Sequence, residues 1–167
     1  TRPTSDKVRE SVFGILASRG EIGGRVLDLF GGTGALGLEA LSRGAARAVL
    51  VDASKRSLSV AERNLKATGL LEKARLVNAD FAAYLSSCRE RFDLAFLDPP
   101  FAAGLLPKAL PLLAPLMNEG GTILCEHPAG LELPREAGSF EAVRTYRYGK
   151  IMTTIYRRKA QEGQEVR

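Results

Sequence analysis

Short apolar runs alternate with stretches of helical periodicity along most of this chain. Buried strands are predicted where the runs are apolar almost throughout, at residues 25–30, 48–52, 74–78, 92–97 and 121–126. Helices are predicted between these runs, at residues 36–44, 55–67, 81–88 and 105–117. A further helix near the start is predicted from the apolar positions Val8, Val12, Ile15 and Leu16. This alternation predicts a mostly parallel α/β sheet with helices on both faces.

The end of the chain follows a different pattern, in which polar and apolar residues alternate. Residues 140–148 and 151–158 alternate around Gly149 and Lys150, which predicts an antiparallel hairpin. The preceding stretch, 128–138, is rich in Pro and Gly and predicts little regular structure. The hairpin completes a seven-stranded sheet in a single domain over residues 1–167.

The turn after the first predicted strand is rich in glycine. Its sequence, Gly32-Thr33-Gly34-Ala35-Leu36-Gly37, has the spacing of a dinucleotide-binding loop, and Asp52 stands where a ribose-binding carboxylate is expected. An NAD-dependent dehydrogenase is therefore one interpretation. Asp28 argues against it, because a carboxylate just before the glycines repels a pyrophosphate. The same carboxylate suits S-adenosylmethionine, which carries a sulfonium and an ammonium group.

Acidic residues lie at the ends of four predicted strands. They are Asp28, Asp52, Asp80 and Asp98. Because ligands bind at the carboxyl ends of strands in open parallel sheets, these residues predict one shared binding rim. Asp80 keeps two interpretations, since it can accept a hydrogen bond from an adenine amine or cap the helix that begins at Phe81.

The sequence Asp98-Pro99-Pro100-Phe101 follows the fourth predicted strand. Neither proline can donate to a sheet ladder, so both are expected in a stiff loop beyond the strand. The Asp98 carboxylate and the Pro99 carbonyl offer two acceptors for the two N–H groups of a base amine, and Phe101 offers a stacking face. Taken alone, the motif also fits a strand-ending turn with a buried Phe. With the cofactor loop, it predicts methyl transfer to a nucleobase amine.

Composition narrows the possible classes. The hydrophobic fraction of 45% and charged fraction of 26% are typical of soluble globular proteins. No apolar stretch has the length of a membrane span and no secretory signal is visible, so a cytoplasmic location without membrane attachment is predicted. Cys88 and Cys125 lack metal-ligand spacing, so reduced thiols and no metal site are expected.

Positive charge is concentrated near the two ends of the chain. Lys and Arg number 24 against 19 Asp and Glu, a net charge of +5. The terminal basic residues are Arg2, Lys7, Arg9, Arg144, Arg147, Lys150, Arg157, Arg158 and Lys159. Such clusters are compatible with contact to a phosphate backbone and equally with solubility alone.

The sequence resembles the RsmD family, bacterial guanine-N2 methyltransferases of 16S rRNA. The resemblance extends over essentially the whole chain. Its strongest elements are Thr1-Arg2-Pro3-Thr4 with Lys7-Val8-Arg9-Glu10, Leu27 to Gly34, Leu97 to Phe101, and Tyr148-Gly149. The resemblance implies a Rossmann-like class I methyltransferase fold. It also implies methyl transfer from S-adenosylmethionine to a guanine N2 amine of 16S rRNA, on an assembling small subunit.

The resemblance further implies which residues form the site. The cofactor loop corresponds to Asp28, Phe30, Gly31, Gly32 and Gly34, with Asp52 on the ribose and Asp80 and Phe81 near adenine. The catalytic loop corresponds to Asp98, Pro99, Pro100 and Phe101. Arg2 and Thr4 are candidates to contact the RNA substrate beside Phe101 or to order the cofactor, with helix capping and surface charge as alternatives. A basic segment that precedes Arg-Pro-Thr in the family is absent from this sequence, and a monomer is expected.

Two other functions stay open at this point. An adenine-N6 methyltransferase on DNA or RNA would share both loops, although it would normally need a recognition region for which this chain has little room. A non-catalytic RNA-binding assembly factor is the second alternative, and the intact Asp28, Gly32, Gly34 and Asp98 speak against it. His127, the single histidine, follows the fifth predicted strand, where a structural role is favoured over catalysis.

Overall fold

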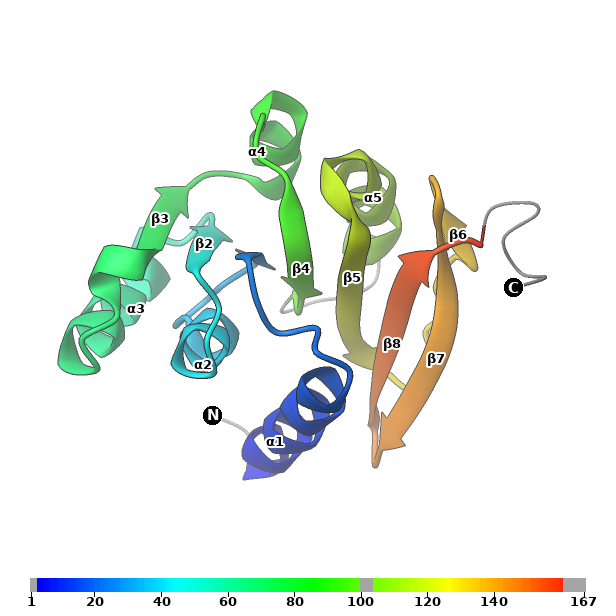
Figure 1. The fold of residues 1–167 in the computed structure, drawn as a ribbon, viewed down its shortest axis with the longest axis horizontal. Coiled ribbons are helices and arrows are strands. Elements are labelled where there is room, and N and C mark those ends of the chain that lie inside the picture. The colour runs from blue at the N-terminus through cyan, green and yellow to red at the C-terminus, as the bar shows by residue number, and fades with distance from the viewer. Residues whose placement is uncertain (1–2, 100–103, 161–167) are drawn as a thin grey trace.

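The computed structural model describes residues 3–99 and 104–160 of the chain (Figure 1). The helices are α1 (Pro3–Ser18), α2 (Ala35–Ser42), α3 (Lys55–Ala67), α4 (Phe81–Ser87) and α5 (Leu105–Leu113), with 3-10 turns η1 (Leu71–Lys73) and η2 (Ala114–Leu116). The strands are β1 (Arg25–Leu29), β2 (Arg47–Asp52), β3 (Ala74–Asn78), β4 (Phe92–Leu97), β5 (Met117–Pro128), β6 (Glu136–Ala137), β7 (Phe140–Tyr148) and β8 (Ile151–Arg158). They form one sheet in the order β3-β2-β1-β4-β5-β8-β7-β6.

The predicted α/β architecture is confirmed. Strands β1 to β5 are parallel, and the β7–β8 hairpin joins β5 in antiparallel orientation. The sheet has eight strands in place of the predicted seven, because Glu136–Ala137 pairs with the start of β7. A two-residue strand has no sequence pattern of its own. It is a strand only because it pairs with Phe140 and Glu141.

The proline-rich helix is shorter than predicted. The α-helix ends at Leu113 and the chain continues as the 3-10 turn η2, in which Pro115 lies. Pro115 has no N–H to donate, which removes one hydrogen bond from the α-helical ladder where the chain changes to the 3-10 turn. Pro111 is accommodated inside α5.

Helices cover both faces of the sheet, with α1, α2 and α3 on one side and α4 and α5 on the other (Figure 1). Strand β4 is buried between the two layers. Phe96 faces α1, where its ring lies 5.4 Å from the ring of Phe13, and Leu97 joins the cluster that contains Leu110 of α5. Burial on both faces explains why the strand is a continuous apolar run.

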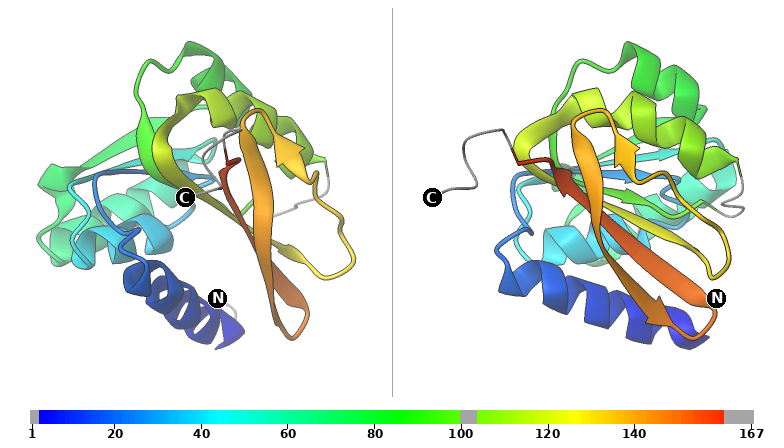
Figure 2. Two further views of the ribbon diagram at one scale, coloured as in Figure 1. Left: turned by 45° about the vertical axis from the view of Figure 1, so that its right-hand side comes forward. Right: turned by 90° about the vertical axis from the view of Figure 1, so that its right-hand side faces the viewer.

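The first helix and the last hairpin pack side by side (Figure 2). The hydroxyl groups of Ser11 in α1 and Tyr148 in β7 are 2.9 Å apart. Beyond the other end of α1, the Glu21 carboxylate accepts hydrogen bonds from Arg157 Nε at 2.7 Å and from Thr122 Oγ1 at 2.8 Å. The first part of the chain is thus joined to the hairpin at two places, one within α1 and one beyond its end.

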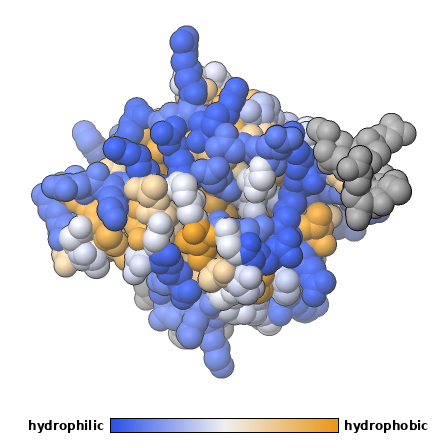
Figure 3. Space-filling model, in the orientation of Figure 1, coloured by the Kyte–Doolittle hydropathy of each residue, from blue (hydrophilic) through white to orange (hydrophobic). Residues whose placement is uncertain are grey.

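The surface is mixed in character. On the face seen in Figure 3, hydrophobic side chains form small areas separated by hydrophilic ones. Within residues 3–99 and 104–160, none of the helices is long and apolar enough to cross a membrane.

The Glu21 contacts lead to a stability prediction. The side chains of Arg157 and Glu21 are only 21% and 13% exposed, so removing Glu21 leaves a partly buried guanidinium unpaired. Glu21→Ala is expected to lower the free energy of unfolding by about 1–3 kcal/mol in urea denaturation. The matched control is Glu62→Ala, which breaks only an exposed pair with Lys66 and is expected to cost less than about 0.5 kcal/mol. Equal losses in the two variants would contradict this role for Glu21.

Candidate active site

Four neighbouring strands bring the predicted acidic residues to one rim of the sheet. Strands β3, β2, β1 and β4 are adjacent in that order and all run parallel, so their carboxyl ends lie side by side. Asp52 ends β2 opposite Asn78 of β3, and Asp28 is the fourth residue of β1. Asp98 directly follows β4, and Asp80 follows β3. The shared rim expected from the sequence is therefore present.

Asp28 is the most deeply buried of these acids, with 1% of its surface exposed. Its Oδ2 atom accepts a hydrogen bond of 3.0 Å from the backbone N–H of Gly37, in the first turn of α2. The residue that caps this helix, Gly34, has no side chain, so Asp28 supplies the acceptor from the strand instead. Burial raises the pKa of Asp28 to about 7, the Gly37 hydrogen bond opposes the rise, and the negative charge of Asp52 adds to it.

The glycine loop packs tightly against β2 and α3. A Cβ atom on Gly34 would lie 2.9 Å from Leu50 Cδ2 and 3.0 Å from Ala61 Cβ, and its φ is +84°. No other residue fits there without displacing the core. The N–H of Gly32 donates to Asp52 Oδ2 at 2.8 Å, which anchors the outer part of the loop to the end of β2.

Phe30 has a left-handed backbone conformation with a φ of 66°, the only such non-glycine residue in the described part of the chain. This conformation costs a phenylalanine about 1–3 kcal/mol. Its ring lies 5.2 Å from the ring of Phe81, at the start of α4, with the two planes tilted by 49°. The backbone turn thus places an aromatic pair between the end of β1 and the start of α4.

Asp52 and Asp80 both accept backbone hydrogen bonds. Asp52 uses Oδ2 for Gly32 and Oδ1 for the N–H of Ser54 at 2.7 Å. Asp80 caps α4, because its Oδ2 accepts from Ala82 and Ala83 at 3.1 and 3.2 Å. The capping interpretation of Asp80 is thereby established, and the cap occupies only one of its two carboxylate oxygens.

The loop that the sequence predicts to be catalytic is described in part. Asp98 is half-buried and Pro99 is buried at the end of β4. Pro100, Phe101 and Arg2 lie outside the described residues. Thr4 lies in the first turn of α1.

His127 is buried near the end of β5, and both of its ring nitrogens have partners. Nδ1 lies 3.1 Å from the Pro128 carbonyl oxygen, and Nε2 lies 2.8 Å from the hydroxyl of Thr154 on β8. Burial lowers the pKa of His127, while the Pro128 hydrogen bond and the charge of Glu126 oppose this. A neutral ring that donates to Pro128 and accepts from Thr154 satisfies all of these contacts.

Two contacts at this rim could not be read from the sequence. The Asp28–Gly37 hydrogen bond needs the fold of the glycine loop, and the Ser11–Tyr148 contact joins residues from opposite ends of the chain. Within the described ranges, no cluster of three or more His, Cys, Asp or Glu side chains has the arrangement of a metal site.

Known proteins resemble this chain over nearly its full length. A family described as "Conserved hypothetical protein 95" matches residues 1–157. The Bacillus subtilis protein YlbH is 37% identical over 164 residues, which cover 95% of this chain and 89% of YlbH. The Ribosomal RNA small subunit methyltransferase D of Escherichia coli strain K12 is 35% identical over 162 residues, covering 96% of this chain and 81% of the relative.

The fold agrees with a solved structure as well. The Escherichia coli protein yhhF superposes with a TM-score of 0.84 at 34% sequence identity. The superposition covers 96% of this chain and 90% of yhhF. The agreement includes the strands that carry the acidic rim, since so little of either chain is left out.

The buried carboxylate predicts a pH effect on stability. Folding raises the pKa of Asp28 from 3.8 to about 7, so the folded protein binds this proton more tightly than the unfolded chain. The resulting stabilisation is present at low pH and is lost as the pH rises through about 7. Relative to Asp28→Asn, the wild-type free energy of unfolding should fall by up to about 1.4 kcal/mol per pH unit between about pH 4 and 7.

Urea denaturation at several pH values between about 5 and 8 measures this difference, which should level off above about pH 7. Asn keeps an oxygen acceptor for Gly37 and does not titrate, so the comparison isolates the buried proton. Asp6→Asn, at an exposed acid on α1, is the matched control. A pH-independent difference between wild type and Asp28→Asn would contradict the raised pKa.

Proposed function

This chain belongs to the family described as "Conserved hypothetical protein 95", and from that premise we propose that it methylates an exocyclic base amine of small-subunit ribosomal RNA. The enzyme is a methyltransferase that uses S-adenosylmethionine. One observation carries the assignment of the site. Asp98 and Pro99 follow β4 directly beside β1, which holds Asp28 and leads into the glycine loop. The amine acceptors and the cofactor loop therefore share one rim.

The cofactor is assigned to the glycine loop and the residues around it. Asp28 is buried behind the loop, and its ionised form attracts the positive groups of S-adenosylmethionine in a low-dielectric setting. Asp52 accepts one backbone N–H on each oxygen, and each oxygen keeps a lone pair for a ribose hydroxyl. The second oxygen of Asp80 and the rings of Phe30 and Phe81 are assigned to adenine.

The transfer step follows from the chemistry of the acceptor. The lone pair of the amine nitrogen forms the new N–C bond while the S–CH3 electrons return to sulfur, and one amine proton leaves for Asp98 or water. A base amine is a weak nucleophile because its lone pair is delocalised. Holding its two N–H groups on Asp98 and the Pro99 carbonyl aims the lone pair, and such positioning supplies about 7–11 kcal/mol in favourable cases. Phe101 is assigned to stacking on the base.

Basic side chains flank this rim on two elements that are joined to each other. Lys7 and Arg9 lie on the N-terminal half of α1, while Arg147 and Lys150 lie at the tip of the β7–β8 hairpin, and the Ser11–Tyr148 contact holds the two elements together. Arg9 forms an ion pair with Asp6 within α1, and Arg157 and Lys159 are paired with Glu21 and Glu136. We assign Lys7, Arg9, Arg147 and Lys150 to contacts with rRNA phosphates, because they lie beside the proposed methyl-transfer site.

The finer parts of the proposal are the target atom and the setting. The proposed target is the N2 amine of a guanine in 16S rRNA. The proposed setting is the cytoplasm, where the protein acts as a monomer, without a metal, on an assembling small subunit. Adenine-N6 methylation would use the same acceptor pair, so the identity of the product separates the two chemistries.

Product analysis tests the proposed function. Small subunits that lack the modification are incubated with the protein and S-adenosylmethionine, and the rRNA nucleosides are then mapped by mass spectrometry. We expect N2-methylguanosine at a single position. N6-methyladenosine would replace the guanine assignment by the adenine one, and absence of any methylated nucleoside would contradict the function as a whole.

The role of Asp98 is tested separately. Asp98→Ala removes one of the two amine acceptors, so kcat is expected to fall by at least about 100-fold while S-adenosylmethionine binding, measured by calorimetry, is unchanged. Glu72→Ala, at an exposed acid in η1, is the matched control and should keep full turnover. Near-normal turnover of Asp98→Ala with intact cofactor binding would remove Asp98 from the mechanism.

A further inference from the structure

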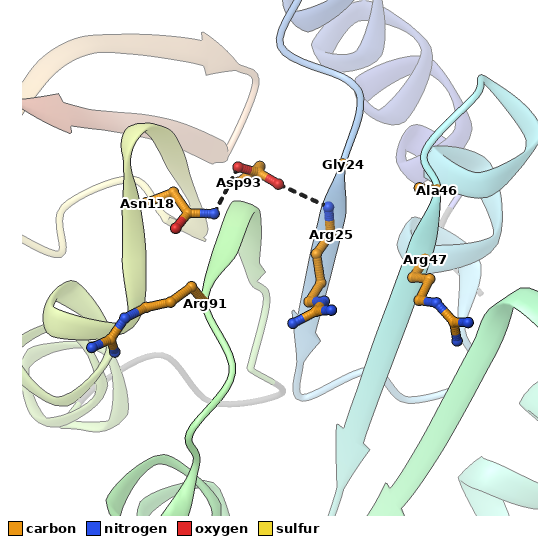
Figure 4. Close-up of a pocket in the computed structure, with 7 residues that line it drawn as sticks. All are labelled: Gly24, Arg25, Ala46, Arg47, Arg91, Asp93 and Asn118. Carbon is orange, nitrogen blue, oxygen red and sulfur yellow. Dashed lines mark hydrogen bonds between the residues drawn. The ribbon is translucent and has the colours of Figure 1, made fainter.

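Arginines lie along the opposite rim of the sheet, where the parallel strands begin. Arg25 is the first residue of β1, Arg47 is the first residue of β2 directly opposite it, and Arg91 immediately precedes β4. The three side chains line one pocket together with Asp93 and Asn118. Figure 4 shows the guanidinium group of Arg25 between those of Arg91 and Arg47, which extend away from each other to either side.

Asp93, the only acid that lines this pocket within the described residues, is hydrogen-bonded to the backbone of β1 and to a side chain of β5. Its Oδ2 accepts from the main-chain N–H of Arg25 at 2.9 Å, and its Oδ1 accepts from Asn118 Nδ2 at 2.9 Å. Gly24 packs so closely that a Cβ atom there would lie 2.1 Å from Asp93 Oδ2. The carboxylate therefore fixes the start of β1 and is not aimed at the guanidinium groups.

Positive charge continues onto the neighbouring strand. A second pocket shares Arg25 and Arg47 with the first and adds residues of β3 and of the segment before β4. Together the two pockets have five basic residues, here called the amino-rim strip: Arg25, Arg47, Lys73, Arg75 and Arg91. Their acidic residues are two, Asp93 and Glu90.

The amino-rim strip is only partly neutralised. Glu90 pairs with Arg75 at 2.8 Å and with Arg25 at 3.5 Å. Across residues 3–99 and 104–160, no ion pair involves Arg47 or Arg91. Arg25 and Arg47 are opposite each other in register, and like charges in that position repel. An anionic partner would relieve this repulsion.

The dimensions and chemistry of the strip indicate the partner. Guanidinium groups bind phosphate through paired hydrogen bonds. Neighbouring strands are about 4.8 Å apart, so a strip over four strands extends about 14 Å and offers cations to several phosphates in succession. A polynucleotide backbone has that spacing of charge, whereas a single small anion would use only part of the strip.

The strands themselves carry opposite charges at their two ends. Each of these four strands has an arginine within one residue of its start and an aspartate within two residues of its end. The pairs are Arg25 and Asp28, Arg47 and Asp52, Arg75 and Asp80, and Arg91 and Asp98. The acidic rim therefore suits a cationic cofactor and an amine, and the basic rim suits a phosphate chain.

We propose that the amino-rim strip binds the phosphate backbone of the rRNA substrate at a second place, on the rim opposite the methyl-transfer site. The inference rests on the proposed function. The two rims are separated by about 15–20 Å along the strands, and the rigid sheet fixes this separation. Backbone contact there adds affinity and helps to select substrates in which a phosphate strand lies at that distance from the modified base.

The test compares two double variants with equal loss of charge. Arg47→Gln with Arg91→Gln removes the two strip arginines that have no ion pair, and Arg56→Gln with Arg63→Gln removes two exposed arginines of α3. Binding to unmodified small subunits is measured over a salt series, together with kcat, KM and S-adenosylmethionine affinity. The strip variant should bind on the order of tenfold more weakly at low salt, with a log–log salt slope reduced by about 1.5 to 2.

The kinetic readout separates binding from chemistry. In the strip variant the KM for subunits should rise while kcat and S-adenosylmethionine affinity stay at wild-type values. Equal losses in the two double variants would reduce the effect to net charge and overturn the strip assignment, as would unchanged binding of the strip variant. If the strip variant gives one of these contradicting results and wild type still methylates rRNA, only the strip assignment is overturned and the proposed function stands. If wild type makes no methylated rRNA, both proposals fall.

Discussion

The carboxylate of Asp28 lies almost completely inside the fold, where the N–H of Gly37 is the hydrogen-bond donor to it. This one bond crosses from β1 to the first turn of α2 and closes the glycine loop between them. It supplies an acceptor that Gly34, at the start of the helix, cannot provide. Because a buried charge with a single donor is costly, the pKa of Asp28 rises to about 7. The buried Asp28 side chain therefore both holds the glycine loop in place and has a raised pKa.

Parallel strands separate the charges of this protein into two rims. In a parallel sheet all strand ends of one kind lie together, so the repeated order from arginine to aspartate in four segments becomes an acidic edge and a basic edge. Asp52 and Asp80 use the acidic edge to anchor the glycine loop and the start of α4. Asp93 anchors the start of β1 on the basic edge. The residues proposed to bind ligands at these two edges thus also make structural hydrogen bonds.

The antiparallel hairpin connects the N-terminal part of the chain to the sheet. Its packing against α1, through Ser11 with Tyr148 and Glu21 with Arg157, sorts the basic residues that cluster near both chain ends. Arg157 pairs with Glu21 and Lys159 pairs with Glu136 of β6, whereas Arg147 and Lys150 lie at the tip of the hairpin. The charge clusters of the sequence therefore have two different roles, and the fold decides which residue has which.

Local patterns in the sequence determined the helices, the main strands, the glycine loop and the motif after β4, because periodicity and proline placement act over a few residues. They missed β6, since Glu136–Ala137 becomes a strand only through its partner strand. They left Asp80 between a cap and an adenine contact, because both need the same position. Strand order, the donor to Asp28, the partners of His127 and the unpaired state of Arg47 among the described residues depend on segments distant in sequence, so only the tertiary structure decided them.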